Sequence, residues 1–270
     1  MTTIVTMFFE LKTGRPRSFY MEHAKKVLSI EAPMVVFCDE STHADLAALR
    51  EDRPTTFFVK PIHEYDYYST LLPIIAANRI TAPSSDSRNT PEYFLLTMFK
   101  FHALQIASQA VRSDHYMWLD IGAAHVARSV PESIYPILAR PRPGIACCYI
   151  HYRPHEELYP IQNYVTGKCG IAATVITVQA SHVSRFYTCM MSMMYEQLML
   201  GVGHAEEQVM VYVYDQHPEW FSLYFGDYYS VATNYHKTVE DHACVQYNFI
   251  LNAAASGNHA LAEEARNSIV

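Results

Sequence analysis

One aspartate, Asp120, directly follows an apolar segment in the sequence YMWLDIGAAHV, which starts at Tyr116. A hydrophobic strand that stops at Asp and Gly places the carboxylate at the C-terminal edge of an α/β sheet, where ligands bind. A carboxylate there suits a divalent cation that also contacts the phosphates of a ligand. The alternative is that Asp120 only caps the turn after the strand, and the residues alone leave both interpretations open.

A lysine in an apolar segment is the second candidate. Lys100 is flanked by Phe99 and Phe101 and comes seven residues after Tyr93, so Tyr93 and Lys100 share one face of a predicted helix. The ammonium of Lys100 can contact a phosphate. Taken alone, the residue can equally extend its aliphatic stem along the surface and keep its charge in water.

Two adjacent glutamates, Glu206 and Glu207, begin a predicted amphipathic helix in the sequence AEEQVMVYVY. Side chains of adjacent helical residues point about 100° apart, so we expect only one of the two to face a substrate. A carboxylate beside a sugar hydroxyl can act as a general base. The alternative, which the residues alone favour, is that both carboxylates only stabilise the helix N-terminus.

A third polar group lies in the aromatic segment FGDYYSVATNYH, which contains Asp227, Asn234 and His236. Histidine is a frequent ligand of metals such as Mn²⁺. The chain has 14 histidines, however, so a single one is more often an ordinary residue than a ligand. His236 becomes a candidate only if other ligands lie near it.

The elements that must position these residues alternate along the chain. Segments rich in β-branched and aromatic residues predict strands, and segments with apolar residues at the helical spacing lie between them. This alternation predicts an α/β fold with helices on both faces of a sheet. Strands are predicted over residues 2–9, 33–39, 55–61, 116–121, 144–150 and 171–178, and helices over 18–30, 41–51 and 91–111, with Ser41 and Thr90 as N-caps.

Composition excludes several classes of protein. The net charge is −7 and the chain has no basic run, which argues against a nucleic-acid partner. The apolar segments are far shorter than the roughly 20 residues that span a bilayer, so no integral membrane segment is expected. The first residues are typical of a strand and not of a signal peptide, and the six cysteines have no metal-ligand spacing. We therefore expect a cytoplasmic protein with reduced cysteines.

Several short motifs, taken in order, resemble one known family. They are TTIVTMFFEL from Thr2, MVVFCDE from Met34, NTPEYFLLTMFKF from Asn89, YMWLDIG from Tyr116 and EEQVMVYVYDQHPEWFSLYFGDYYSVATNY from Glu206. The chain resembles the HtrL/YibB type of protein, grouped with WlaTC-like glycosyltransferases. The resemblance covers most of residues 1–236. Residues 237–270 are predicted to form a C-terminal helical extension, two helices joined at residues 256–258.

This resemblance implies a glycosyltransferase-A fold with a mostly parallel, Rossmann-like sheet. It also implies a nucleotide-sugar donor, a glycan or glycoconjugate acceptor, and a Mn²⁺ or Mg²⁺ ion on the diphosphate. The family's Asp-x-Asp metal motif falls on Asp120, but Gly122 stands at its second acidic position. His236 is the residue we expect to supply the missing ligand. The remaining donor contacts are assigned to Thr6, Phe8, Asn89, Tyr93, Lys100, Trp118, Asp120 and Gly122.

The resemblance also assigns a role to Glu207. Enzymes of this fold that invert the anomeric centre carry a carboxylate base at the start of a helix, which places Glu207 ahead of Glu206 as the catalytic base. Two other functions remain open. One is a nucleotide-sugar or glycan-binding protein without catalysis. The other is a sugar-phosphate nucleotidyltransferase, although the segment FFELKTGRPRS from Phe8 has few of the glycines that its phosphate loop requires.

Overall fold

The computed structural model describes residues 1–11, 16–78, 90–152, 170–201, 205–236 and 243–268. Within these ranges a seven-stranded sheet has the order β3-β2-β1-β4-β6-β5-β7. The strands are β1 (Thr2–Phe8), β2 (Met34–Cys38), β3 (Thr55–Val59), β4 (His115–Leu119), β5 (Ile145–Tyr149), β6 (Ile171–Gln179) and β7 (Tyr224–Phe225). β6 pairs antiparallel with both of its neighbours, and every other pair is parallel. The predicted α/β fold with a mostly parallel sheet is confirmed.

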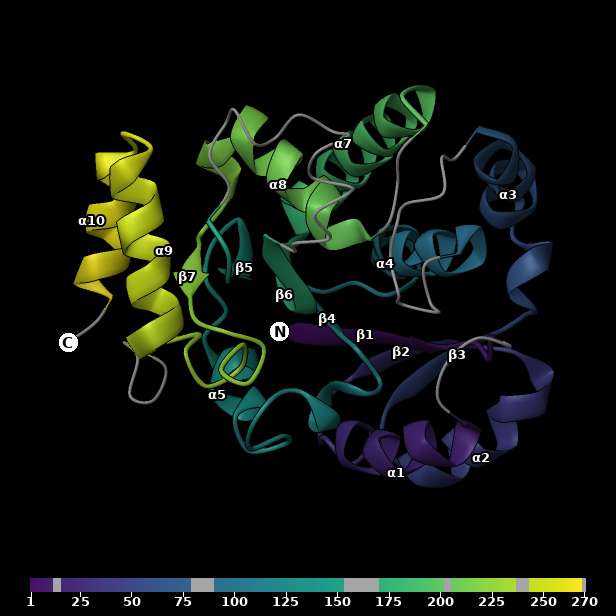
Figure 1. The fold of residues 1–270 in the computed structure, drawn as a ribbon. Helices are drawn as coiled ribbons and strands as arrows, with labels where there is room; N and C mark the ends of the chain where they lie inside the picture. Colours follow the sequence, from purple (N-terminus) through teal and green to yellow (C-terminus); the bar gives the residue numbers. More distant parts are fainter. Residues whose placement is uncertain (12–15, 79–89, 153–169, 202–204, 237–242, 269–270) are drawn as a thin grey trace.

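Helices cover both faces of this sheet (Figure 1). One face carries α1 (Arg17–Leu28), α2 (Glu40–Arg50) and α5 (Ile134–Ala139), and the other carries α3 (Asp66–Asn78), α4 (Pro91–Ala110), α7 (Ala180–Met199) and α8 (Glu206–Gln216). Three 3-10 turns connect them, η1 (Ile62–Glu64), η2 (Ala123–His125) and η4 (Pro218–Trp220). The strands are almost wholly buried because they contribute to two hydrophobic cores, one on each face.

The last two helices, α9 (Ala243–Ala255) and α10 (His259–Asn267), stand beside β7 at the end of the sheet (Figure 1). Phe249 of α9 packs its ring on Tyr149 of β5 and Phe225 of β7, with ring centroids 4.9 and 5.0 Å apart. The two predicted helices and their junction at Gly257, which has a positive φ of 79°, are therefore present. They share the core of the first 236 residues.

The caps of two helices differ in how well the sequence predicted them. Thr90 is the N-cap of α4, and its side chain accepts a hydrogen bond from the backbone N–H of Tyr93 at 3.2 Å. The cap of α2 is Asp39 and not Ser41. Asp39 accepts from the backbone N–H of Thr42, and the hydroxyl of Ser41 donates to the same carboxylate. A carboxylate at the cap position serves as a stronger acceptor than a hydroxyl two residues inside the helix.

The described part of the chain contains no helix with both the length and the apolarity needed to cross a membrane. Four cysteines are described, and all are free: Cys38, Cys147 and Cys148 are buried, and Cys189 is partly buried. This agrees with the prediction of reduced cysteines.

Candidate functional site

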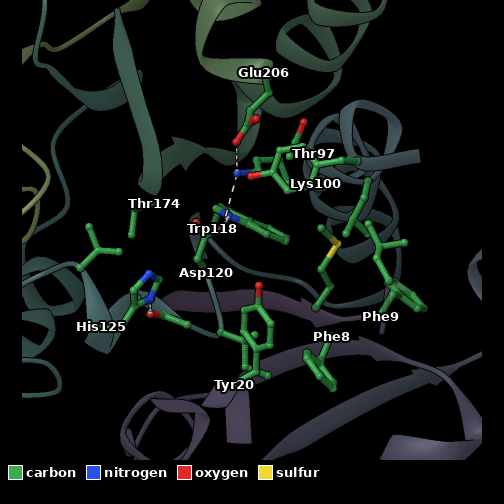
Figure 2. A pocket seen from close by; sticks show the side chains of 18 of the residues that line it. Phe8, Phe9, Tyr20, Thr97, Lys100, Trp118, Asp120, His125, Thr174 and Glu206 are labelled. Atoms are coloured by element: carbon green, nitrogen blue, oxygen red, sulfur yellow. Dashed lines mark hydrogen bonds and ion pairs between the residues drawn. The ribbon is translucent and has the colours of Figure 1, made fainter. Parts of the chain in front are cut away.

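A cavity of about 770 Å³ lies at the C-terminal ends of β1 and β4. In the sheet, β2 and β3 lie on one side of β1, and β4 lies on its other side. The cavity therefore lies where the strand order reverses. Open α/β sheets bind ligands at this switch point, and the volume suits a small-molecule ligand. Its walls come from the ends of β1 and β4, from α1, α4 and η2, from the start of α8, and from residues 228 and 229. Figure 2 shows many of these side chains.

Asp120 occupies the floor of the cavity, directly after β4. Its Oδ1 accepts hydrogen bonds from the indole Nε1 of Trp118 at 2.7 Å and from the Nζ of Lys100 at 3.4 Å. Its Oδ2 has no hydrogen-bond partner among the described residues, and the side chain is 39% exposed. Asp120 therefore does not cap the turn after the strand with its carboxylate. One oxygen remains available to a ligand.

Lys100 lies in the wall above Asp120 and is only 3% exposed. Its ammonium donates to the Oε1 of Glu206, to the Oδ1 of Asp120 and to the carbonyl of Ala173 at 3.3 Å. Burial alone disfavours the ammonium, but the neighbouring carboxylates outweigh it and raise the pKa of Lys100. Lys100 is therefore not a surface lysine, and its three donors are already used by oxygens of the protein.

Burial affects the carboxylate of Asp120 in the opposite direction. It raises the pKa of Asp120, while the nearby ammonium of Lys100 opposes this shift. The lining of the cavity holds four acidic side chains, at positions 10, 120, 206 and 207, and only two basic ones, Arg17 and Lys100. A cluster with this surplus favours the approach of a cationic group or ion.

Glu206 and Glu207 both line the cavity. The expectation that only one of them faces a substrate stays a prediction. Glu206 turns toward Lys100 (Figure 2). Glu207 accepts from the backbone N–H of Ala173 at 3.0 Å through Oε1 and from the phenol of Tyr228 through Oε2. Neither carboxylate serves only as a helix-end charge, because each has a specific partner on another element.

The structure brings several of the other predicted residues to the cavity. Phe8, Tyr93, Trp118 and Gly122 belong to its lining, and Tyr93 and Lys100 face it from the same side of α4 as predicted. Thr6 does not belong to the lining, since it is fully buried in β1 and its hydroxyl has no hydrogen-bond partner among the described residues. Asn89 lies outside the described residues, as do residues 79–88.

His236 is not brought to the cavity either. It is exposed, and its Nε2 lies 3.1 Å from the carbonyl oxygen of Pro136 in α5. Asp227 and Asn234 from the same segment hold a turn together: Asp227 accepts from the backbone N–H of Ser230, and Asn234 donates to the carbonyl of Phe225. This segment supplies the cavity with tyrosines instead of with the predicted polar residues.

The sequence analysis missed several polar or aromatic lining residues, among them Glu10, Tyr20, Thr97, His125, Thr174, Tyr228 and Tyr229. His125 follows Asp120 by five residues in the sequence DIGAAH, which was the signal available for it. The tyrosines carried no signal, because the chain has 20 of them and their types do not reveal which ones face a ligand.

The residues of the cavity fit a divalent cation that is also held by a ligand. Within the described ranges no three or more His, Cys, Asp or Glu side chains cluster as a metal site. A Mg²⁺ or Mn²⁺ ion that contacts phosphates, however, often takes only one or two carboxylates from the protein. The open oxygen of Asp120 meets this requirement.

Comparisons with known proteins show similarity in fold but not in sequence. No protein-family model and no curated protein matches the chain. Membership of the HtrL/YibB family therefore stays a prediction.

Among solved structures, mouse xyloside xylosyltransferase 1 in its apo form matches with a TM-score of 0.52 at 10% identity, over 83% of this chain and 85% of that chain. Core-mannan synthase A from Aspergillus fumigatus, in its Mn/GDP form, gives 0.46 at 7% identity over 82% and 72%. The 4-diphosphocytidyl-2C-methyl-D-erythritol synthase from Anaerococcus prevotii gives 0.39 at 9% identity over 84% and 89%. The match to the xylosyltransferase shows that the chain has a glycosyltransferase-A-like α/β fold.

Proposed function

We propose that this protein is a glycosyltransferase that moves a sugar from a nucleotide-diphosphate sugar to a hydroxyl of a glycan or glycoconjugate. The observation that carries the proposal is the open Oδ2 of Asp120, which lies in a cavity at the switch point of a glycosyltransferase-A-like sheet. The cavity has the size of a small-molecule site and an excess of carboxylates over ammonium groups. This combination suits a diphosphate ligand that arrives with a divalent cation.

In this proposal Asp120 would hold Mn²⁺ or Mg²⁺ with its open oxygen. The cation, when bound, would neutralise charge on the diphosphate that leaves the sugar. Trp118 and Lys100 fix the other oxygen of Asp120, so the open oxygen keeps one direction. Lys100 also keeps the Glu206 carboxylate compensated inside the wall of the cavity.

Glu207 is the proposed general base. Its two oxygens are oriented by the N–H of Ala173 and the phenol of Tyr228. A carboxylate in this position can take the proton of an acceptor hydroxyl. Tyr228 and Ala173 are positioning groups in this role, because they act through the carboxylate.

The experiment that tests the proposal is a calorimetric titration of UDP, GDP and their sugar conjugates, with and without Mn²⁺. We expect one nucleotide to bind in the presence of Mn²⁺ and Asp120→Asn to weaken this binding at least about tenfold, a loss of about 1.4 kcal/mol. The matched control is Asp114→Asn, because Asp114 precedes β4 and Asp120 follows it. Asp114 is exposed and contacts the N-terminal amine.

Glu207→Gln separates binding from catalysis. It should keep donor binding and lower transfer at least about 100-fold, since a general base contributes that much. If the wild type binds a nucleotide but transfers sugar to no acceptor, the alternative of a binding protein without catalysis is favoured. The observation that motivates this alternative is Gly122, which stands in place of the second acid. Absence of nucleotide binding by the folded wild type would exclude the proposed function.

A further inference from the structure

Thr174 of β6 is a buried threonine that lines the cavity. The residue is only 6% exposed, and its hydroxyl has no hydrogen-bond partner among the described residues. Buried hydroxyls are usually hydrogen-bonded, because a buried polar group without a partner costs free energy. Figure 2 shows the side chain of Thr174 on the same side of the cavity as Asp120. A ligand in the cavity can therefore supply the partner that the protein does not.

The strand β6 carries extra residues beside β5 at this point. The pairs on either side of it are Ala146 with Thr177 and Cys148 with Ala172. One residue of β5 thus lies opposite four residues of β6, numbers 173–176. Irregularities of this kind, like β-bulges, redirect side chains and are frequent beside active sites.

The alternation of side chains along β6 is shifted at the same place. Ala172 and Val175 both pack in the core on the face of α1 and α5, whereas residues three apart in a regular strand point to opposite faces. In the same way, Ala173 and Ile176 share the core on the other face. The two patterns meet at Thr174, which explains how its side chain can turn to the cavity.

Thr174 also lies between the two acids to which the proposed function assigns roles. Its carbonyl accepts a hydrogen bond from the backbone N–H of Asp120 at 3.0 Å. The N–H of the preceding residue, Ala173, donates to Oε1 of Glu207 at 3.0 Å. In the proposed function the diphosphate lies at Asp120 and the acceptor hydroxyl at Glu207, so the sugar that is transferred must connect the two. The sugar is then the part of the ligand that faces Thr174.

We infer that Thr174 forms a hydrogen bond with a hydroxyl of the transferred sugar and thereby selects the donor. This inference rests on the proposed function. A threonine hydroxyl can both donate and accept, so it can pair with a sugar hydroxyl in either direction. A site that hydrogen-bonds a substrate hydroxyl rejects the analogue without it, because its own polar group is then left without a partner. The protein should therefore prefer a sugar with a free hydroxyl at the contacted carbon over the matching deoxy sugar.

The test compares the binding of a nucleoside diphosphate with that of its sugar conjugate, by calorimetry in the presence of Mn²⁺. The pair used is the one among UDP, GDP and their sugar conjugates that the wild type binds best. Thr174→Val keeps the shape of the side chain and removes its hydroxyl, so it should weaken binding of the conjugate about three- to tenfold. Binding of the nucleoside diphosphate alone should not change. Thr174→Ser keeps a hydroxyl and should restore binding of the conjugate.

Thr6→Val is the matched control. Thr6 is a strand threonine whose hydroxyl also has no partner among the described residues, but it does not belong to the lining of the cavity. It is also the threonine that the sequence resemblance assigned to the donor. Thr6→Val should leave the affinities for both ligands unchanged.

Three results would overturn the inference. The first is unchanged binding of the conjugate by Thr174→Val, and the second is an equal loss of both ligands, which a purely structural residue would give. The third is a loss of conjugate binding in Thr6→Val as large as that in Thr174→Val.

Failure of this inference and failure of the proposed function give different results. If the wild type binds the nucleoside diphosphate and its conjugate, and Thr174→Val changes neither affinity, only the inference is wrong. If the folded wild type binds neither ligand with or without Mn²⁺, the proposed function is wrong and the inference falls with it.

Discussion

Two buried cations lie at opposite edges of the same sheet, and their partners differ. Arg50 lies at the amino-terminal edge, is 1% exposed, and donates to four backbone carbonyls and one hydroxyl. These acceptors are the carbonyls of Leu28, Ile30, Ala32 and Pro54 and the hydroxyl of Thr55. Lys100 lies at the carboxyl-terminal edge and has two carboxylates and one carbonyl as partners.

The difference separates a structural charge from a charge at a ligand site. Burial lowers the pKa of Arg50 to about 10, yet the guanidinium stays protonated at neutral pH and donates to carbonyls at the end of α1 and just before β2 and β3. All five N–H donors of Arg50 are used on neutral acceptors, so none is left for a ligand. Around Lys100 the carboxylates exceed the ammonium in charge, and Asp120 keeps one open oxygen. Surplus acceptors, and not burial of charge by itself, mark the functional edge.

The largest effect is expected from Arg50→Met. Without the guanidinium the carbonyls of Ile30 and Pro54 keep a backbone N–H, but those of Leu28 and Ala32 have no other donor among the described residues. The free energy of unfolding should therefore fall by about 3–5 kcal/mol, since each unsatisfied group costs about 1–3 kcal/mol before relaxation. Urea unfolding measures it. Arg53→Met is the control, because Arg53 pairs with an exposed Glu51 and should cost under about 1 kcal/mol. Equal effects of the two substitutions would contradict the structural role of Arg50.

A smaller effect is expected from the pair of Lys100 and Glu206. Lys100→Met leaves the carboxylate of Glu206 buried without its cation, whereas the additional Glu206→Gln removes that charge. A double-mutant cycle in urea should therefore give a coupling energy of about 1–3 kcal/mol. A coupling energy near zero would mean that the two side chains do not form an ion pair in solution.

The smallest effect concerns His102, a partly buried base that has neither carbonyls nor carboxylates as partners. His102 stacks on Tyr67 with ring centroids 5.1 Å apart, its Nδ1 lies 3.2 Å from the hydroxyl of Tyr187, and burial lowers its pKa. The unfolded chain therefore binds a proton first as the pH falls. Stability that is present above pH 6.5, the ordinary value, is lost as the pH drops toward the lowered pKa.

We expect the unfolding free energy to fall by at most about 1.4 kcal/mol per pH unit in this window from one group. His102→Gln should make the slope shallower, as measured by urea unfolding at several pH values below 6.5. An unchanged slope would assign the acid sensitivity to other groups. This measurement sharpens the comparison with Arg50 and Lys100. It asks whether His102, which has no carboxylate partner, is neutral in the folded protein.

Strong local patterns made the fold predictable. The apolar segment at 116–121 predicted β4, which the structure places at His115–Leu119, and the helix predicted over 91–111 is α4 at Pro91–Ala110. The antiparallel direction of β6 could not be predicted, because a fully buried strand has the same apolar composition in either direction. The cap at Asp39 instead of Ser41 shows that helix ends depend on competition between neighbouring acceptors.

The candidate site was predictable only in part. Asp120, Lys100 and Glu207 combine unusual residue types with a recognisable place along the chain, and all three line the cavity. Thr6 and His236 were assigned by analogy of position, and the cavity does not include them. The direction of a side chain in a strand or turn depends on register and on packing, which sequence spacing does not specify.

The sequence by itself therefore determined the alternation of strands and helices, and with it the edge of the sheet at which Asp120 had to lie, because hydrophobic periodicity and chain connectivity are local properties. Only the tertiary structure decided which groups meet there. Lys100 comes from α4, Glu206 from α8 and Thr174 from β6. Their proximity follows from helices packing across the sheet, and distances between side chains from separate elements are not encoded in any single stretch of residues.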